Sequence, residues 1–391
     1  MILTTCAVCA TELGLTSGKK CGRCSTRYCG AACQVQHWKE GGHDQLCKKI
    51  KKAGGAEQYN ANKKYSEAVA VAATACAEDT KGQTCYICTE AVHRHTGEGL
   101  VRGCACHTTE GFVHVSCLAE QAKILVAEAV ENKLGGKALG ERFGRWHTCS
   151  LCEQGYHGVV YCALGWACWK MYVGRPETDG LRSCAMQQLG SGLSAAGHHE
   201  EELSVKEAQL AMIRRIGASE HDTLAAQHNL ATTYSSLGRA EESLRMRRDV
   251  YAGRLRRNGE EHAVTIIAAQ NYATCLAGLQ RFEEAKSVSR TTLPVARRVL
   301  GDSDDVTLRI RWTYAMVLYK DPAATLDDLR LAVNTLEDLD QTARRVLGAT
   351  HPLASGIEIS QQEARAALGI TLRDTLAALR AREAAPPTGD A

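Results

Sequence analysis

Cysteine is confined almost entirely to one part of this chain, and this distribution constrains the fold more than any other feature. The sequence has 391 residues and 19 cysteines, of which only Cys275 lies after Cys184. Cysteine at this density usually forms disulfide bonds in secreted domains or binds metal as thiolate inside cells. The N-terminal stretch MILTTCAVCATELGL lacks the basic start and long apolar core of a secretory signal. We therefore predict metal sites in an intracellular protein, either cytoplasmic or nuclear.

The rest of the composition argues against two other classes of partner. The most apolar stretch, residues 158–169, is shorter than the roughly 20 apolar residues that cross a bilayer. The formal net charge is +3, and we interpret the basic run KKIKK at residues 48–52 as a solvated helix face rather than a nucleic-acid patch. We expect neither a membrane nor a nucleic acid as partner.

A first array of candidate metal ligands occupies the N-terminal 47 residues. A Cys-x-x-Cys pair places two thiolates on a tight turn, where both can reach one zinc ion. A closed structural zinc site takes four ligands, so eight candidates predict two sites. A module of this size buries too little apolar surface to fold without its metal. The candidates are Cys6, Cys9, Cys21, Cys24, Cys29, Cys33, His43 and Cys47, with His37 as a rival to His43.

This array resembles the MYND-type zinc finger, on Tyr28-Cys29, Cys33-Gln34, His37-Trp38, His43 and Cys47. The resemblance implies two cross-braced sites, one formed by Cys6, Cys9, Cys29 and Cys33 and the other by Cys21, Cys24, His43 and Cys47. Four residues separate Trp38 from His43, where the family usually has two; Gly41 and Gly42 would let the loop bulge there. The resemblance also implies that the module binds short proline-containing peptides.

A second array of eight candidates follows, again as four pairs, so we expect four zinc ions in all. Its members are Cys85, Cys88, Cys104, Cys106, His114, Cys117, Cys149 and Cys152. His107 competes with its neighbour Cys106, but adjacent residues rarely reach the same ion, and we predict that His107 lies on the surface. The segment 119–145, which begins AEQAKILVAEAVENKL, is predicted to be a helix.

The order of the second array resembles the RING-CH (RING-variant) finger, with cysteine as the fourth ligand and histidine as the fifth. The resemblance implies one site of Cys85, Cys88, His114 and Cys117 and another of Cys104, Cys106, Cys149 and Cys152. It also implies a ubiquitin ligase that docks a ubiquitin-conjugating enzyme at Ile87 and Leu118. Gln121 stands where many such fingers have tryptophan and Glu153 where active ones often have a basic residue. These two departures favour a non-enzymatic role, whereas the order of the ligands and Ile87 favour a ligase, which we place slightly ahead for this finger.

The C-terminal half repeats itself every 42 residues. Thr223, Thr265 and Thr307 keep this spacing, and Ala231, Ala273 and Ala315 keep it too. A fixed period of this length predicts stacked helical hairpins, each of which buries its apolar face only against its neighbours. Within each unit, a turn such as the one near Gly238 should separate the two helices.

The repeats resemble tetratricopeptide repeats of the longer, kinesin-light-chain-like kind, on the phrases ARRVLGDSDDVTL and ARRVLGATHPLA. About four units fit between Leu181 and Leu368, with the last one degenerate. The resemblance implies a concave groove that binds a peptide or a partner helix. The predicted fold is therefore mostly α: an α-solenoid of helical-hairpin repeats preceded by two small cross-braced zinc-binding modules.

The predicted organisation is a MYND-type finger at 1–50, a helical linker at 51–80, a RING-CH-type finger at 81–155, an aromatic connector at 156–180, repeats at 181–370, and a helix end with a disordered tail at 371–391. The remaining cysteines, Cys76, Cys162, Cys168, Cys184 and Cys275, are predicted to be buried free thiols.

Two functions stay open for this protein-interaction architecture. One is a RING-type ubiquitin ligase whose repeats and MYND finger select the substrate. The other is a scaffold or adaptor that joins partner proteins through both fingers and the repeats. We discount a lysine methyltransferase, because the chain has no SET-like Asn-His-Ser-Cys stretch and no room for that domain.

Overall fold

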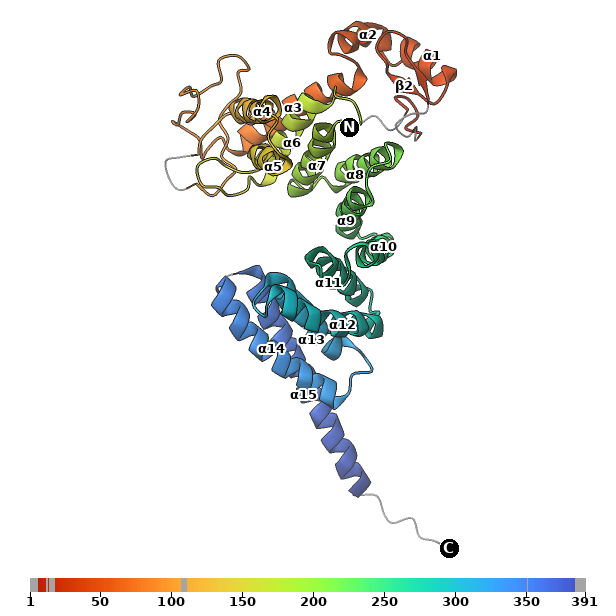
Figure 1. The fold of residues 1–391 in the computed structure, drawn as a ribbon, viewed down its shortest axis with the longest axis vertical. Helices are drawn as coiled ribbons and strands as arrows, with labels where there is room; N and C mark the ends of the chain where they lie inside the picture. The colour runs from red at the N-terminus through yellow and green to blue at the C-terminus, as the bar shows by residue number, and fades with distance from the viewer. Residues whose placement is uncertain (1–5, 12, 14–17, 107–110, 350, 384–391) are drawn as a thin grey trace. The chain divides into compact units, whose positions relative to one another are not determined.

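The computed structural model describes residues 6–11, 13, 18–106, 111–349 and 351–383, and the chain forms two compact units, Met1–Leu237 and Gly238–Ala391. Both units are built mainly from helices (Figure 1). The Cys/His groups lie in the first unit. The predicted fold class, mostly α with helical repeats after small Cys/His modules, is confirmed.

The N-terminal module is small and has few apolar residues in its core. An antiparallel pair of short strands, β1 (Lys19–Lys20) and β2 (Arg27–Tyr28), precedes α1 (Ala31–Lys39) and α2 (His43–Lys52). Ile50 in α2 is buried, whereas the four lysines around it are exposed, as predicted for a solvated helix face. Cysteines make up much of this core, so the module has little apolar burial to stabilise it without metal.

The second Cys/His module lies between α3 (Ala56–Ala75) and residue 157. It contains loops, two isolated β-bridges, α4 (Val115–Glu131), α5 (Gly136–Phe143) and a short 3-10 turn at Gly144–Trp146. The helix predicted over 119–145 is confirmed only in part: it begins four residues earlier, at Val115, and is interrupted between Glu131 and Gly136. His114 is therefore the N-cap residue of α4, and Cys117 lies in its first turn.

The segment predicted as an aromatic connector contains a buried helix, α6 (Gly158–Tyr172), that packs against α3, α4 and α7 (Gly180–Ala195). Apolar residues cover every side of α6, which is typical of a helix inside a core. A Cβ atom on Gly192 of α7 would lie 2.8 Å from the carbonyl oxygen of Tyr161. The close approach of α6 and α7 therefore requires glycine at this position.

The remaining helices form the repeat array, in which neighbouring helices within each unit pack on one another. The first unit ends with α8 (His199–Arg215) and α9 (Glu220–Ser236). The second contains α10 (Ala240–Asn258), α11 (Ala263–Gly278), α12 (Phe282–Leu300), α13 (Asp305–Lys320), α14 (Leu326–Leu347) and α15 (Pro352–Glu383). Ala231, Ala273 and Ala315 are buried, as their 42-residue spacing predicts. Gly238, at φ 72°, forms the predicted turn between α9 and α10.

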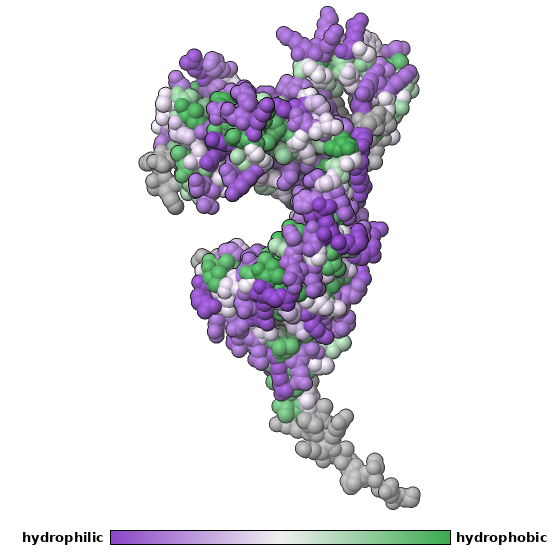
Figure 2. Space-filling view, in the orientation of Figure 1, coloured by the Kyte–Doolittle hydropathy of each residue, from purple (hydrophilic) through white to green (hydrophobic). Residues whose placement is uncertain are grey.

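The described helices include none that is both long and apolar enough to cross a membrane. Hydrophilic residues cover most of the face seen in Figure 2, with small apolar patches between them.

Candidate metal centres and repeat groove

The side chains predicted as zinc ligands meet in four groups of four. Within each group the candidate ligand atoms all lie within 4.8 Å of one another. We name the groups site 1 (Cys6, Cys9, Cys29, Cys33), site 2 (Cys21, Cys24, His43, Cys47), site 3 (Cys85, Cys88, His114, Cys117) and site 4 (Cys104, Cys106, Cys149, Cys152). These groupings are the ones that the MYND and RING-CH resemblances imply.

The sulfur atoms of site 1 have the spacing of metal ligands. The Sγ atom of Cys29 lies 3.5 Å from that of Cys9 and 3.4 Å from that of Cys33, and the third separation, Cys9 to Cys33, is 3.8 Å. Disulfide sulfurs lie only about 2.05 Å apart. Four ligands in a tetrahedron with Zn–S bonds of about 2.3 Å have sulfurs about 3.8 Å apart. The site 1 cysteines therefore fit a zinc ion.

Site 2 joins the turn at Cys21–Cys24 to the start of α2. His43 is the first residue of α2 and Cys47 lies four residues later, so both side chains project from the same face of the helix. The Nε2 atom of His43 lies 3.4 Å from the Cys24 sulfur, and the sulfurs of Cys21 and Cys47 are 3.9 Å apart. These four side chains are all buried, as expected of a closed structural site.

His37 takes no part in site 2. Its Nδ1 atom lies 2.9 Å from the Tyr28 hydroxyl in a hydrogen bond, and burial lowers the pKa of its imidazole. A Cβ atom on Gly41 would lie 2.3 Å from the Cδ2 atom of His37. Glycine at this position therefore allows the longer loop to pass His37 and bring His43 to the thiols.

Sites 3 and 4 interleave along the chain. In site 3 the Nδ1 atom of His114 lies 3.3 Å from the Cys88 sulfur and 3.7 Å from the Cys117 sulfur. In site 4 the sulfurs of Cys106 and Cys149 are 3.7 Å apart. Each site ties together segments that are distant in sequence, so ions bound here would stabilise a module with little regular structure. His107, the rival ligand, lies outside the described residues.

Burial, backbone N–H groups and neighbouring thiols shift the pKa values of the cysteines in these sites. Burial opposes ionisation of Cys6, but backbone N–H groups of Cys9 and Cys29 outweigh it and lower the pKa of Cys6 to about 6. In the same site the thiol of Cys29 raises the pKa of Cys33 to about 12. In site 2, burial raises the pKa of Cys47 to about 11. Crowded thiols cannot all ionise unaided, and a divalent cation between them would permit it.

The two loops that carry the first pair of site 3 and the last pair of site 4 lie side by side. The hydroxyls of Tyr86 and Ser150, one in each loop, are hydrogen-bonded at 3.3 Å. Ile87 and Leu151 stand next to them and are 39% and 46% exposed. Leu118 differs from the prediction: it is only 2% exposed and packs in the core beneath α4, where no partner can contact it.

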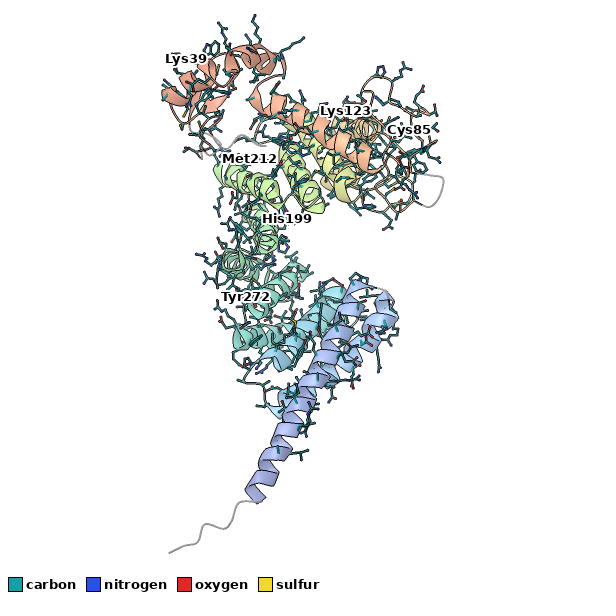
Figure 3. All side chains as sticks on the ribbon, turned by 180° about the vertical axis from the view of Figure 1, so that it is seen from behind. Lys39, Cys85, Lys123, His199, Met212 and Tyr272 are labelled. Atoms are coloured by element: carbon teal, nitrogen blue, oxygen red, sulfur yellow. The ribbon has the colours of Figure 1, made fainter. Side chains whose placement is uncertain are left out.

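Leu151 is a surface residue that the sequence prediction missed. It holds the third position of Cys149-Ser-Leu-Cys152, as Ile87 does in Cys85-Tyr-Ile-Cys88. Comparing the two Cys-x-x-Cys pairs would have identified it without the structure. The side chains of this module, around Cys85, are drawn in Figure 3.

A cavity of about 380 Å³ opens between α7, α8 and α9 in the first unit. Its lining combines polar side chains, among them Gln209, Asn229 and Asp222, with a larger apolar surface that includes Ile213 and Ile216. Cys184 also faces it and is exposed, contrary to the prediction of a buried thiol; Cys275, in the second unit, is half-buried. This cavity is one place among the first unit's repeat helices that is open to a ligand.

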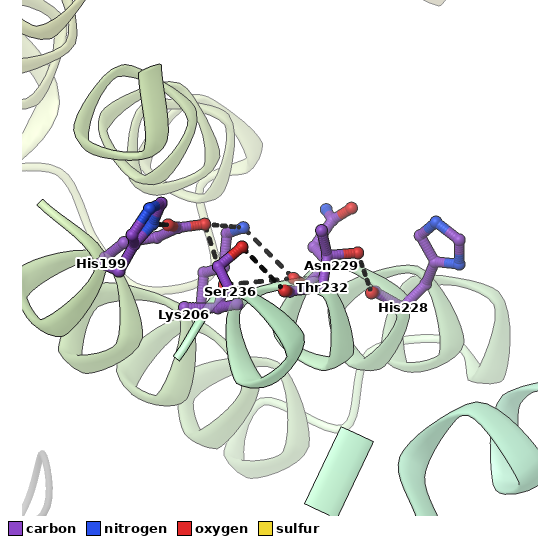
Figure 4. A network of polar contacts seen from close by, with 8 residues as sticks. His199, Lys206, His228, Asn229, Thr232 and Ser236 are labelled. Carbon is purple, nitrogen blue, oxygen red and sulfur yellow. Dashed lines mark hydrogen bonds and ion pairs between the residues drawn. The ribbon is translucent and has the colours of Figure 1, made fainter. Parts of the chain in front are cut away.

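A buried polar network lies behind this cavity and fixes α8 against α9 (Figure 4). Glu202 is fully buried; it is paired with Lys206, receives a hydrogen bond from the Thr233 hydroxyl at 2.8 Å, and lies 3.0 Å from His199. The Lys206 ammonium donates to the carbonyl oxygen of Asn229 at 3.2 Å. Burial opposes ionisation of Glu202, but these partners outweigh it and lower its pKa. The backbone of Asn229 is thereby held in place at the cavity wall.

Two family models match parts of the chain. The MYND finger matches residues 6–47, and the tetratricopeptide repeat matches residues 223–263. No curated protein matches the chain.

Several solved structures are similar to the chain. A protein of Podosopora anserina, with nearly identical TPR-like repeats of the kinesin light chain type, is 18% identical with a TM-score of 0.40, covering 59% of this chain and 97% of its own. BtubC (BKLC) of P. vanneervenii is 14% identical with a TM-score of 0.38, covering 71% and 94%. The TPR2AB domain of yeast Sti1, in complex with pHSP90, is 11% identical with a TM-score of 0.23, covering 64% and 99%. By the two family models, the chain combines a MYND finger at residues 6–47 with a tetratricopeptide repeat at residues 223–263.

Proposed function

We propose that this protein is a non-enzymatic scaffold that joins partner proteins through its zinc-stabilised fingers and its repeats. The observation that carries the proposal is the cavity between α7, α8 and α9, which the chain leaves open. Tetratricopeptide repeats generally bind peptides or partner proteins, and a MYND finger adds a second surface, for proline-containing peptides. The second finger, sites 3 and 4, adds a third module.

The chemistry of the cavity favours an extended peptide as its ligand. Gln209 and Asn229 carry amides that both donate and accept hydrogen bonds, which suits a peptide backbone. The Gln209 amide already donates to the Ser183 carbonyl at 3.2 Å, so its orientation is fixed before a ligand arrives. Preorganised polar groups around a concave surface reduce the entropy lost on binding.

A peptide selection on the zinc-loaded full-length protein tests the proposal. Selected peptides should bind with an affinity that Asn229→Ala reduces by about tenfold, because loss of one or two hydrogen bonds has roughly this effect. Gln227→Ala is the matched control, since Gln227 lies two residues earlier on the opposite side of α9. If no selected peptide responds to Asn229→Ala, the cavity is not the binding surface and the proposal loses its main support.

A ubiquitin ligase is the second candidate, and the neighbouring exposed side chains of Ile87 and Leu151 favour it. They form a small apolar surface at the edge of the second finger, which resembles the RING-CH type. A ligase of this class would act by holding a conjugating enzyme and its ubiquitin close to a substrate. Leu151 replaces the buried Leu118 as the second docking residue in this proposal.

Ubiquitin discharge from charged conjugating enzymes separates the two candidates. A ligase should accelerate discharge in the presence of the zinc-loaded protein, and both Ile87→Ala and Leu151→Ala should abolish the acceleration. Val92→Ala is the control, because Val92 is an exposed apolar residue outside the two Cys-x-x-Cys loops. No discharge with a broad panel of conjugating enzymes, at full zinc content, would leave the scaffold as the function.

A further inference from the structure

The charged side chains that line the cavity between α7, α8 and α9 are all acidic. The described residues of its lining include Glu177, Asp179 and Asp222, but no lysine, arginine or histidine. These carboxylates do not form one of the close groups of candidate metal ligands among the described residues. Metal ligands must converge on one ion. The acidic lining therefore favours an organic cation over a metal ion.

The three carboxylates differ in whether a cation already neutralises them. Glu177 pairs with Arg215 at 2.8 Å. Asp179 pairs with Arg175 at the same distance, and neither arginine lines the cavity. Asp222 forms no ion pair among the described residues, and its carboxylate accepts a hydrogen bond from the neutral N-cap hydroxyl of α9 at 2.7 Å. One negative charge at the cavity wall is thus left without a cation.

This unpaired carboxylate lies at the end of an apolar wall. Helices α8 and α9 form an antiparallel hairpin, in which the Lys206 ammonium donates to the Asn229 carbonyl at 3.2 Å. Seven residues nearer to the connecting loop on each helix lie Ile213 and Asp222, so the two should be level with each other. Ile213 is only 5% exposed, and Ile216 lines the cavity three residues further along α8.

Gln209 supplies a fixed hydrogen-bond acceptor in the same cavity. The residue is only 5% exposed, and its amide nitrogen donates to the Ser183 carbonyl at 3.2 Å. Its Oε1 atom receives no hydrogen bond from the described residues and is not one of their fully buried unpaired atoms, so it is open to the cavity that Gln209 lines. Gln209 precedes Ile213 by four residues, about 6 Å along the helix, which is comparable with an extended arginine side chain.

We propose that this cavity binds an arginine residue of an extended partner peptide. The aliphatic part of the side chain packs on Ile213 and Ile216 and leaves the charged end free to reach the carboxylate of Asp222. The backbone N–H of the same arginine donates to the Oε1 atom of Gln209. The inference rests on the proposed function, because it names the kind of peptide that the cavity selects.

The chemistry of the lining favours arginine over the other side chains that a peptide could offer. A guanidinium is planar and can donate two parallel hydrogen bonds to one carboxylate, whereas the lysine ammonium acts as a point charge. An acidic side chain would meet the carboxylates of the lining, and like charges brought together disfavour binding. A purely apolar side chain would cover the two isoleucines but would leave Asp222 without a partner.

Heptapeptide pools displayed on beads test this inference with the zinc-loaded full-length protein. The pools are random except at the central position, which is arginine, citrulline or glutamate; citrulline has nearly the shape of arginine without its charge. The arginine pool should bind about tenfold more tightly than the citrulline pool, as expected for a hydrogen bond between charged groups. Asp222→Asn should remove this preference, because it keeps the shape of the side chain and removes its charge.

Glu200→Gln is the matched control. Glu200 is an exposed carboxylate in the first turn of α8, as Asp222 is in the first turn of α9, but it does not line the cavity. Its substitution should leave the preference for arginine unchanged. Equal binding of the arginine and citrulline pools, tighter binding of the glutamate pool, or equal effects of the two substitutions overturns the inference.

The same experiment separates this inference from the proposed function. If the bound peptides respond to Asn229→Ala but show no preference for arginine, the proposed function stands and the inference alone fails. If no pool binds, both are contradicted. Circular dichroism and zinc content of each variant confirm that the substitutions leave the fold intact.

Discussion

At the scale of single residues, the metal sites illustrate how far sequence reasoning reaches. The grouping of the side chains in sites 1 to 4 could be predicted, because the spacing of cysteine pairs identifies the candidates and the MYND and RING-CH resemblances imply their order. The exposure of Leu118 was not predictable, because it depends on where α4 begins and which face of it meets the core. Cys184 likewise faces a cavity that only the packing of three helices creates.

His37 and His43 provide a direct test of the site 2 assignment. We expect His43→Ala to lower the zinc content by one ion per chain and to destabilise the N-terminal module, because it removes one of four ligands. His37→Ala removes only the hydrogen bond with Tyr28, so its zinc content should match the wild type. Zinc analysis of purified variants is the measurement, and the reverse outcome would make His37 the ligand.

The ion pair between Lys286 and Asp321 should make stability depend on pH. Both side chains are 9% exposed and lie 2.7 Å apart. The hydrogen bond from Lys286 lowers the pKa of Asp321, so the carboxylate is more acidic when folded than when unfolded. The pair therefore stabilises the fold fully above the unfolded pKa of about 3.9 and loses this effect as pH falls through the lower, folded pKa.

We expect Asp321→Asn to reduce the free energy of unfolding by about 2 kcal/mol at pH 7, and by progressively less as the pH falls below about 4. Denaturant unfolding at several pH values measures the difference in free energy of unfolding between wild type and variant. Any zinc release at low pH affects both proteins and does not change this difference. Asp327→Asn is the control, because Asp327 is 91% exposed. A constant difference across pH would show that the pair is not the cause.

At the scale of secondary-structure elements, the repeats were easier to predict than α6. The 42-residue period predicts the positions of helices, turns and buried alanines together, because each repeat packs against its neighbours in the same way. Helix α6 has no polar face, so it lacks the 3.6-residue periodicity that identifies helices from sequence. Its role became clear only from its partners α3, α4 and α7.

The contact between α6 and α7 predicts a strong effect of adding a single methyl group. Gly192→Ala should lower the free energy of unfolding by about 2 kcal/mol, because the new Cβ atom would lie against the backbone of Tyr161 and Cys162. Gly369→Ala in α15 has open space around it and should stabilise its helix by up to about 1 kcal/mol. Thermal unfolding followed by circular dichroism distinguishes them; equal effects would contradict this packing.

At the scale of the whole molecule, the two units should differ in whether their stability depends on zinc. All four candidate sites lie in the first unit, and one hydrophobic core connects site 3 and site 4 residues with α6, α7 and α8. The described part of the second unit, from Gly238 onward, contributes no candidate ligand to them. Its stability should therefore not depend on zinc.

Chelation of zinc should therefore unfold the two fingers and loosen α6 and α7, while α11 to α14 keep their structure. Structural zinc contributes on the order of 10–16 kcal/mol to such modules. Hydrogen exchange with and without chelator is the measurement, read at the peptides of each helix. Uniform loss of protection through α14 would contradict the independence of the second unit, and unchanged protection throughout would argue against metal in the fingers.

The buried position of α6 has a consequence for how this architecture can be inherited or rearranged. From the sequence alone, the second finger and the repeats look like separate domains joined by residues 156–180. In three dimensions that joint holds Trp166 and Trp169 inside a common interior with α3 and α7. Recombination or proteolytic cleavage there would leave two fragments, each with an apolar surface newly exposed to solvent. The second finger and the first repeat should therefore be inherited together, as a single structural unit.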